Sequence, residues 1–200
     1  GFALHAAGKY GCRVTTTTIS ENQYRYALDR IQRAGLVNRV RVLMEDYRDL
    51  RGTFSKLVSI EMIEAVGHRF LGRFFEKCAS LLTPGGAMAI QAITVPDQVY
   101  DRSTRDVDFI KRYIFPGGQC PSVAAMLNAV RDRTDLRLHG LEDLTEHYAR
   151  TLTCWRESFF RHLDQVRKLG FDERFIRMWD FYLGLCAGSF AERYTGLVQM

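Results

Sequence analysis

Two carboxylates and a histidine follow a short apolar run in the first half of the sequence. The run "KLVSI" leads directly into Glu61, with Glu64 and His68 close behind. Carboxylates at the end of a buried strand cost desolvation free energy unless a partner or a reaction uses them. Their closeness in the chain indicates acid–base chemistry, in which a held group takes up or releases a proton.

The three side chains are open to different interpretations. His68 falls four residues beyond Glu64, near a predicted helix start, which favours support of that turn over direct chemistry. Glu61 either faces a cofactor or acyl channel or pairs with an arginine, and the sequence leaves both open. Deciding among these roles requires the elements that position the residues.

Strand and helix signals alternate through the first half of the chain. Strands are predicted at residues 12–19, 39–46, 56–60 (a buried strand) and 87–94. One helix follows Ser20, with Gln23 completing a capping-box pattern and Gly35 as its stop; another ends at a Pro-Gly-Gly sequence, residues 84–86. Strands separated by helices of this length predict a parallel sheet, and ligands of such sheets bind beyond the carboxyl ends of the strands.

The second half departs from this alternation. A polar stretch, predicted to be helical, ends at Pro116, and residues 135–144 return as a strand. Helices are then predicted at residues 149–169 and 172–187, separated by Gly170, and a closing strand at residues 194–200. Without repeats or a linker, we expect one domain over residues 1–200, with a lid-like insertion at about 95–135.

Composition restricts the class of protein. The 200 residues are 46% hydrophobic and 26% charged, which fits a folded domain rather than a disordered chain. No apolar run approaches the roughly 20 residues needed to cross a bilayer, and no leader pattern is present. Five scattered cysteines without a C-x-x-C motif argue for free thiols in a reducing compartment and against disulfides or structural zinc. No metal site is expected. The net charge of +5 permits an anionic partner, either nucleic acid or an acidic lipid surface.

A set of stretches, taken together and in order, resembles one family almost from end to end. The stretches are "VTTTTISENQ", "DYRDL", "KLVSIEMIEAVGH", "FFEKCASLLTPGG", "QAITVPD", "FIKRYIFPGG", "LHGLEDLTEHYARTL" and "FDERFIRMWDFYL". They resemble the cyclopropane-fatty-acyl-phospholipid synthase family, which includes the mycolic acid methyltransferases and uses S-adenosylmethionine. The resemblance implies an α/β, class I methyltransferase-like (Rossmann-type) fold, with a mostly parallel sheet, helices on both faces and a helical lid. It also implies that the first strand and a glycine-rich loop precede this chain, leaving only Gly1 of that loop.

The resemblance assigns a cofactor site to residues at strand ends. The matching positions are Gly1, Thr18, Ile19, Gln23, Asp46 and Tyr47. Thr18, Ile19 and Gln23 match positions near the ribose, while Asp46 and Tyr47 match the adenine edge. Two alternatives stay open: Gln23 is only a capping residue, and "EDYRDL" is only a solvated loop.

The implied reaction sets further requirements. An alkene that attacks a sulfonium methyl group becomes a carbocation, which needs apolar walls, aromatic faces and a base. The family is understood to hold a bicarbonate ion as that base. The resemblance places Glu64 and Tyr148 on the ion, gives Ile93 a backbone N–H contact, and puts Gln91 where the family often has histidine. Glutamine donates a hydrogen bond but cannot carry a proton, so the charge balance at the ion would change.

Aromatic residues of the second half form a candidate lipid channel. The set is Tyr113, Phe115, Tyr148, Trp155, Phe159, Trp179, Phe181 and Tyr182. Aromatic side chains at helical spacing are usually core, so we expect most of them to be core. Tyr113 and Phe115, beside the "PGG" of the insertion, are the better channel candidates.

The leading hypothesis is S-adenosylmethionine-dependent transfer of a one-carbon unit to the double bond of an unsaturated phospholipid acyl chain. This predicts a cytoplasmic protein peripheral to the inner membrane face, with a homodimer as one way to cover an incomplete sheet. One alternative is a methyltransferase for a soluble small molecule; another is a noncatalytic, truncated member of the family. Nucleic-acid binding ranks last, because the sequence has no basic stripe.

Overall fold

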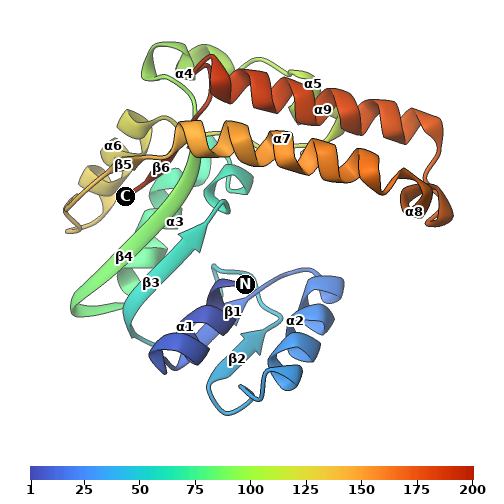
Figure 1. Cartoon of the computed structure of the whole chain (residues 1–200). Helices are drawn as coiled ribbons and strands as arrows, with labels where there is room; N and C mark the ends of the chain where they lie inside the picture. Colours follow the sequence, from blue (N-terminus) through green and yellow to red (C-terminus); the bar gives the residue numbers. More distant parts are fainter. The chain divides into compact units, whose positions relative to one another are not determined.

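A computed structural model describes every residue from 1 to 200 and divides the chain into two compact units, residues 1–52 and 53–200 (Figure 1). The two units hold separate sheets, one of two strands and one of four. This division does not test the single domain predicted for residues 1–200, which stays a prediction.

The first unit is a small α/β layer. Its elements are α1 (Phe2–Tyr10), β1 (Val14–Thr17), α2 (Glu21–Arg33) and β2 (Val40–Leu43). The strands pair in parallel, with Val14 opposite Val40 and Thr17 opposite Leu43. A small core of Ala7, Ile31, Val40 and Val42 joins the helices to the sheet. Parallel pairing brings the carboxyl ends of both strands to one edge.

The ends of α2 follow the sequence signals with one difference. The Ser20 side chain accepts a hydrogen bond from the Gln23 N–H (3.4 Å), and Gly35, at φ 67°, follows the last turn. The second bond of the predicted capping box, from the Ser20 N–H to the Gln23 side chain, is wrong. The Ser20 N–H donates to the Thr18 hydroxyl instead (3.1 Å). The Gln23 side chain instead accepts from the Thr18 hydroxyl (2.8 Å), so capping does not occupy it.

The second unit contains a four-stranded mixed sheet. Its elements are β3 (Phe54–Ile60), η1 (Ile63–Ala65), η2 (His68–Phe70), α3 (Leu71–Ser80), β4 (Leu82–Thr94), α4 (Asp97–Ser103), α5 (Phe109–Tyr113), α6 (Val123–Arg133), β5 (Glu142–Asp143), α7 (Thr145–Arg161), α8 (Leu163–Lys168), α9 (Glu173–Ala191) and β6 (Gly196–Gln199). The strand order is β3-β4-β6-β5; β3 and β4 are parallel, and β6 runs antiparallel to both of its neighbours.

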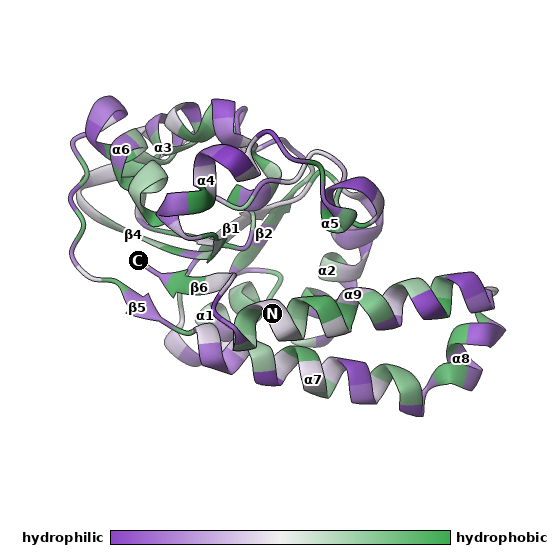
Figure 2. Cartoon of the chain, turned by 90° about the horizontal axis from the view of Figure 1, so that it is seen from above, coloured by the Kyte–Doolittle hydropathy of each residue, from purple (hydrophilic) through white to green (hydrophobic).

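Helices cover both faces of this sheet, as expected. Figure 2 shows α3 and α6 on one side of β4 and the antiparallel pair α7 and α9 on the other. α3 buries Leu71, Phe74, Phe75 and Cys78, as its helical spacing predicts. Leu152, Leu183, Phe190 and Leu197 form the core that joins α7, α9 and β6. Each helix of the chain is too short or too polar to span a lipid bilayer.

Two strand predictions are wrong in part. β3 was expected to be buried, yet Val58 and Ile60 are 40% and 47% exposed, because β3 is an edge strand paired only with β4. The strand expected at residues 135–144 contracts to the two residues of β5. Propensity alone does not supply the neighbouring strand that hydrogen-bonds a segment into a sheet.

The Pro-Gly-Gly sequence has a different role from the predicted one. α3 already ends at Ser80, and residues 84–86 lie inside β4, where the register shifts between the Phe54–Leu82 and Lys56–Ala87 pairs. Gly85 has φ 73°, which a side chain would oppose. The three residues therefore form an irregularity within a long strand, not a helix stop.

The segment predicted as an insertion is helical, as expected, but its helices are short. Residues 95–135 form α4, α5 and α6, of which α6 had no sequence prediction. Further along, α7 begins earlier than residue 149 and is separated from α8 at His162. The closing strand is confirmed as β6, and Gly170, at φ 91°, precedes α9.

Candidate functional site

The predicted cofactor residues of the first unit lie at one edge of its sheet. Thr18 and Ile19 follow β1, Asp46 and Tyr47 follow β2, and the Thr18 N–H donates to the Leu43 carbonyl (3.1 Å). Ile19 is 75% exposed, so it presents an apolar surface to whatever binds this edge. The carboxyl ends of parallel strands are where such folds bind ligands.

The polar groups of this edge keep hydrogen-bonding capacity. Asp46 accepts from the Arg48 backbone N–H (2.9 Å) and from its guanidinium (2.9 and 2.7 Å), and these bonds lower the Asp46 pKa to about 2. A carboxylate has about four acceptor positions, so Asp46 remains able to accept another donor. The Gln23 amide N–H groups have no partner. This set of groups fits a nucleoside.

Gly1 is the remaining predicted cofactor residue. It precedes α1, and its carbonyl accepts a hydrogen bond from the His5 N–H (3.2 Å). It forms no hydrogen bond with Thr18, Ile19, Gln23 or Asp46. Its assignment therefore rests on the family resemblance alone.

Glu64 of η1 is held by the neighbouring strand β4. Its Oε1 accepts the Ile93 backbone N–H (2.6 Å), and its backbone carbonyl accepts the Gln119 N–H (2.7 Å) from the segment after α5. Its Oε2 is buried and has no hydrogen-bond partner. A buried oxygen without a partner is costly, so it marks a place where a polar group of a ligand would be accommodated.

Glu61 binds two other predicted site residues, Gln91 and Tyr148. Its Oε1 accepts from the Gln91 side-chain amide (2.7 Å), and its Oε2 accepts from the Tyr148 hydroxyl (2.6 Å). Gln91 is itself fixed by the Gln199 amide, which donates to its Oε1 (2.7 Å). The chain of bonds thus runs from β6 through β4 to Glu61 and on to α7.

The predicted site residues of the second unit therefore fall into two linked pairs. Glu64 meets Ile93 directly, whereas Gln91 and Tyr148 meet only through Glu61, whose role the sequence left open. Glu61 pairs with no arginine. The His68 side chain makes no hydrogen bond or ion pair and lies in η2, and its support of the turn stays a prediction. The one sequence signal for Glu61 was its place directly after the strand that is β3 in the structure. There, the register sets Ile60 opposite Gln91, so the next residue, Glu61, lies close to Gln91.

Burial governs the electrostatics of this site. Desolvation raises the pKa of Glu64 above its ordinary value, and the charge of Glu61 adds to the rise. Desolvation, the hydrogen bond to Glu61 and its charge raise the pKa of Tyr148. The pKa values of Cys120 and Tyr182 rise to about 12, again mainly through desolvation. A charge formed here would be poorly solvated, so nearby charges and dipoles act strongly on it.

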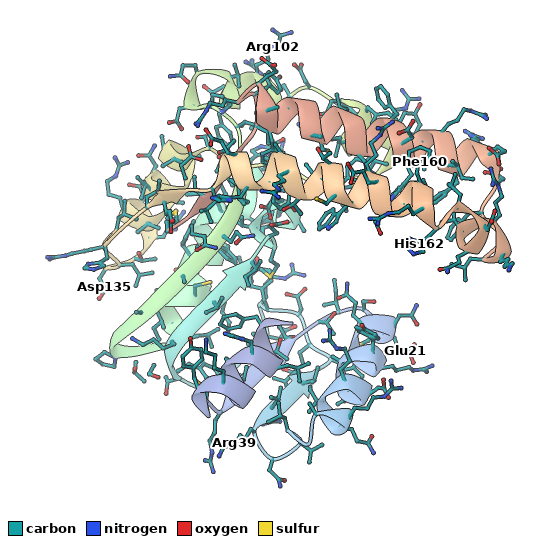
Figure 3. The ribbon with its side chains drawn as sticks, viewed as in Figure 1. Glu21, Arg39, Arg102, Asp135, Phe160 and His162 are labelled. Atoms are coloured by element: carbon teal, nitrogen blue, oxygen red, sulfur yellow. The ribbon has the colours of Figure 1, made fainter.

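Aromatic rings border the carboxylates. The Tyr148 ring packs against Phe190 (4.8 Å between centroids) and Trp155 (6.1 Å), and Tyr182 packs against Trp179 (5.2 Å) and Phe115 (6.2 Å). Further out, Phe160 and His162 lie at the end of α7 remote from the sheet (Figure 3).

The exposed fraction separates the members of this aromatic set. Tyr113 and Phe115 are 52% and 57% exposed, and so are not core. Trp155 and Phe181 are also more than half exposed, contrary to the core role expected for most of the set. These side chains lie on helices that pack together, which leaves their outer faces open.

Known proteins resemble this chain over nearly its whole length. The chain is 40% identical over 196 residues to the tuberculostearic acid methyltransferase UfaA1 of Mycobacterium tuberculosis, covering 98% of this chain and 46% of that protein. It is 32% identical over 201 residues to the cyclopropane-fatty-acyl-phospholipid synthase of Escherichia coli K12, covering 100% of this chain and 50% of that protein. The chain thus spans about half the length of these curated relatives.

A solved structure has the same fold as this chain. The structure of mycolic acid cyclopropane synthase CmaA1 complexed with SAH and CTAB superposes with a TM-score of 0.89 at 26% identity, covering 98% of this chain and 71% of that one. The predicted class I methyltransferase-like fold is therefore confirmed. The family model for mycolic acid cyclopropane synthetase matches residues 1–200, and the chain belongs to that family.

Proposed function

We propose that the protein transfers a one-carbon unit from S-adenosylmethionine to the double bond of an unsaturated acyl chain on a phospholipid. The observation that carries the proposal is the partly buried group of Glu61, Glu64 and Tyr148, bordered by aromatic rings, in a chain of this family. A methyltransferase for a soluble amine or hydroxyl acceptor has less need of such surroundings, because its reaction forms no carbocation.

S-adenosylmethionine is the cofactor that the first unit's residues would fit. Gln23 and Thr18 would meet the ribose hydroxyls, Asp46 would accept from the adenine amine, and Ile19 would cover the ring. When bound, the cofactor supplies an electrophilic methyl group. The similar cyclopropane synthase CmaA1 forms a complex with SAH, which supports this proposal.

The second unit would stabilise the positive charge that an attacking alkene acquires. The faces of Tyr148 and Tyr182 would stabilise a cation, and the Glu61 carboxylate, hydrogen-bonded to the Tyr148 hydroxyl, would place negative charge nearby. Apolar neighbours such as Phe190 exclude water, which would otherwise trap the cation as an alcohol. The chain's own work is thus charge stabilisation and water exclusion.

We also propose that the helical segment at residues 95–135 forms a lid over an acyl channel. The Gln119 N–H binds the Glu64 carbonyl (2.7 Å), and Phe115 packs on Tyr182. Exposed apolar side chains on α5, α7, α8–α9 and their connections offer a surface for lipid; they are Tyr113, Phe115, Trp155, Leu169, Phe171 and Phe181. With a net charge of +5, the protein would dock on an anionic bilayer from the cytoplasmic side.

The test is transfer of labelled methyl groups to lipid vesicles. The purified protein, given methyl-labelled S-adenosylmethionine, should label vesicles of unsaturated phosphatidylglycerol and leave saturated vesicles unlabelled. Titration calorimetry with the cofactor reports binding separately. Intact cofactor binding without label in any unsaturated lipid would reject a lipid substrate, and a protein that stays in the supernatant when vesicles are sedimented would point to a soluble acceptor. The relatives' names cover both methylated and cyclopropanated products, so the label's final position identifies the product.

A further inference from the structure

Glu61 has a backbone conformation that its side chain does not favour. Its φ is 49°, in the left-handed region that glycine adopts freely and other residues rarely do. Strain of this kind persists where the surroundings hold the residue in place. The surroundings here are β4, whose Gln91 carbonyl accepts the Glu61 N–H (2.9 Å), and the two side-chain donors to its carboxylate.

Those donors come from elements far apart in the chain. The Gln91 amide (2.7 Å) approaches one carboxylate oxygen and the Tyr148 hydroxyl (2.6 Å) the other. Gln199 fixes Gln91 from the antiparallel strand β6, and the Phe190 and Trp155 rings border Tyr148. The carboxylate is therefore oriented on both sides before any ligand arrives.

This arrangement does not fit a separate bicarbonate ion. The three groups expected to donate to that ion are the Tyr148 hydroxyl, the Gln91 amide and the Ile93 N–H, and each already donates to a carboxylate of this chain. One carboxylate oxygen of this site, Glu64 Oε2, has no partner. A further anion would thus meet the Glu61 carboxylate and no free donor among the three expected groups.

We infer that the side-chain carboxylate of Glu61 takes the place of the anion and serves as the proton acceptor of the reaction. This inference rests on the proposed function. The alkene's electron pair forms a bond to the methyl carbon as the carbon–sulfur bond breaks, which leaves a carbocation on the acyl chain. Glu61 then takes a proton from the new methyl carbon, and the electrons of that carbon–hydrogen bond form a bond to the cationic carbon, which closes the ring. If a hydride first shifts from the methylated carbon to the cationic carbon, the same electrons form a methylene double bond instead. The proton on Glu61 passes to water when the product leaves.

The environment of Glu64 supports this division of roles. Burial raises the pKa of Glu64 first, and the charge on Glu61 raises it further, so the neutral form of Glu64 is favoured beside an ionised neighbour. Pairs of carboxyl groups whose environments separate their protonation behaviour commonly divide acid and base roles. Glu61, with both oxygens hydrogen-bonded to neutral donors, is the one placed as a base.

The test is chemical rescue of Glu61→Gly. Glycine suits φ 49°, so this variant keeps the fold while leaving a space the size of a carboxylate. In carbon-dioxide-free buffer, the wild-type protein should methylate lipid at the same rate with or without added bicarbonate. Glu61→Gly should lose about 100-fold, and added bicarbonate or formate should restore about a tenth or more of the lost activity. Glu61→Gln should lose as much without rescue, because its side chain fills the space.

Controls separate this inference from the proposed function. Titration calorimetry should give the same cofactor affinity for wild type and Glu61→Gly, and the exposed variant Glu76→Gln should behave as wild type. Carbon-13 bicarbonate should bind Glu61→Gly, but not the wild type, by nuclear magnetic resonance. A wild-type protein that methylates lipid only with added bicarbonate would overturn the inference, and so would a fully active Glu61→Gly or one that neither anion rescues. Absence of lipid methylation by the wild type under every condition would reject the proposed function itself.

Discussion

Residues 1–52 place Thr18, Ile19 and Asp46 at an exposed strand edge, whereas residues 53–200 hold Glu61 and Glu64 among partners from β4 and α7. At the exposed edge the side chains of Asp46 and Gln23 form hydrogen bonds with near neighbours in the sequence, Arg48 and Thr18. In the buried group the partners are 29, 30 and 87 residues apart. Water satisfies exposed groups, whereas buried groups need partners that only the tertiary fold supplies.

The largest expected effect concerns the longest of these links. Tyr148→Phe keeps the ring but removes the donor to Glu61 Oε2, so the carboxylate loses one of its two orienting bonds. We expect methyl transfer to lipid to fall about 100-fold, a typical cost for one oriented donor at a reacting centre. The free energy of unfolding should fall by only about 1 kcal/mol, as for one partly buried hydrogen bond.

The matched control is Tyr194→Phe, which changes an exposed tyrosine of the same unit. It should leave both the rate and the urea midpoint unchanged. If Tyr148→Phe and Tyr194→Phe had equal rates, the link between α7 and Glu61 would have no part in the reaction.

The next effect concerns the pH dependence of stability. Burial raises the pKa of Glu64 above its ordinary value of 4.5. Below that value, folded and unfolded chains both hold the proton, and Glu64 contributes nothing. As pH rises, the unfolded chain releases its proton first, so the wild type loses stability until the folded-state pKa is passed. Glu64→Gln should remove this loss, by about 1.4 kcal/mol for each pH unit between the folded and unfolded pKa values.

Urea unfolding of wild type and Glu64→Gln between about pH 4 and pH 8 measures this difference. The two curves should meet at low pH and separate in favour of the variant as pH rises. A constant difference across the range would show that ionisation of Glu64 does not affect folding.

The smallest effect belongs to the exposed edge, where the pH dependence of stability has the opposite sign to that of Glu64. Arg48 lowers the Asp46 pKa from 3.8 to about 2. The pair therefore contributes stability at pH values above 3.8, and this contribution is lost as the pH falls through about 2. Arg48→Ala should return the Asp46 pKa towards 3.8 with little change in stability at neutral pH, because the pair is largely solvated. Carbon-detected titration of the Asp46 carboxyl measures this value; an unchanged pKa would mean that Arg48 does not bind it in solution.

The same contrast explains what the sequence could predict. The α2 cap at Ser20 and the stop at Gly35 follow local patterns, and the family resemblance assigns Glu64 and Ile93 to one site, although not their direct hydrogen bond. The role of Glu61 does not, because two donors, Gln91 and Tyr148, reach it only in the folded chain.

The fold shows the same division. The alternation of strands and helices predicted a parallel sheet and the final strand β6, and the spacing of Phe74, Phe75 and Cys78 predicted the buried face of α3. The exposure of β3, the two-residue β5 and the irregularity at residues 84–86 depend on which strands pair, and in what register. Pairing depends on partners distant in sequence, which propensity does not identify.

The most direct test of the whole account is one measurement on the wild-type protein: the rate of carbon-13 methyl transfer from S-adenosylmethionine to unsaturated phosphatidylglycerol vesicles in bicarbonate-free buffer. We expect labelled acyl chains, at a rate that added bicarbonate does not change. A rate near zero that rises with bicarbonate would contradict the role given to Glu61, and no labelled lipid under either condition would contradict the proposed function.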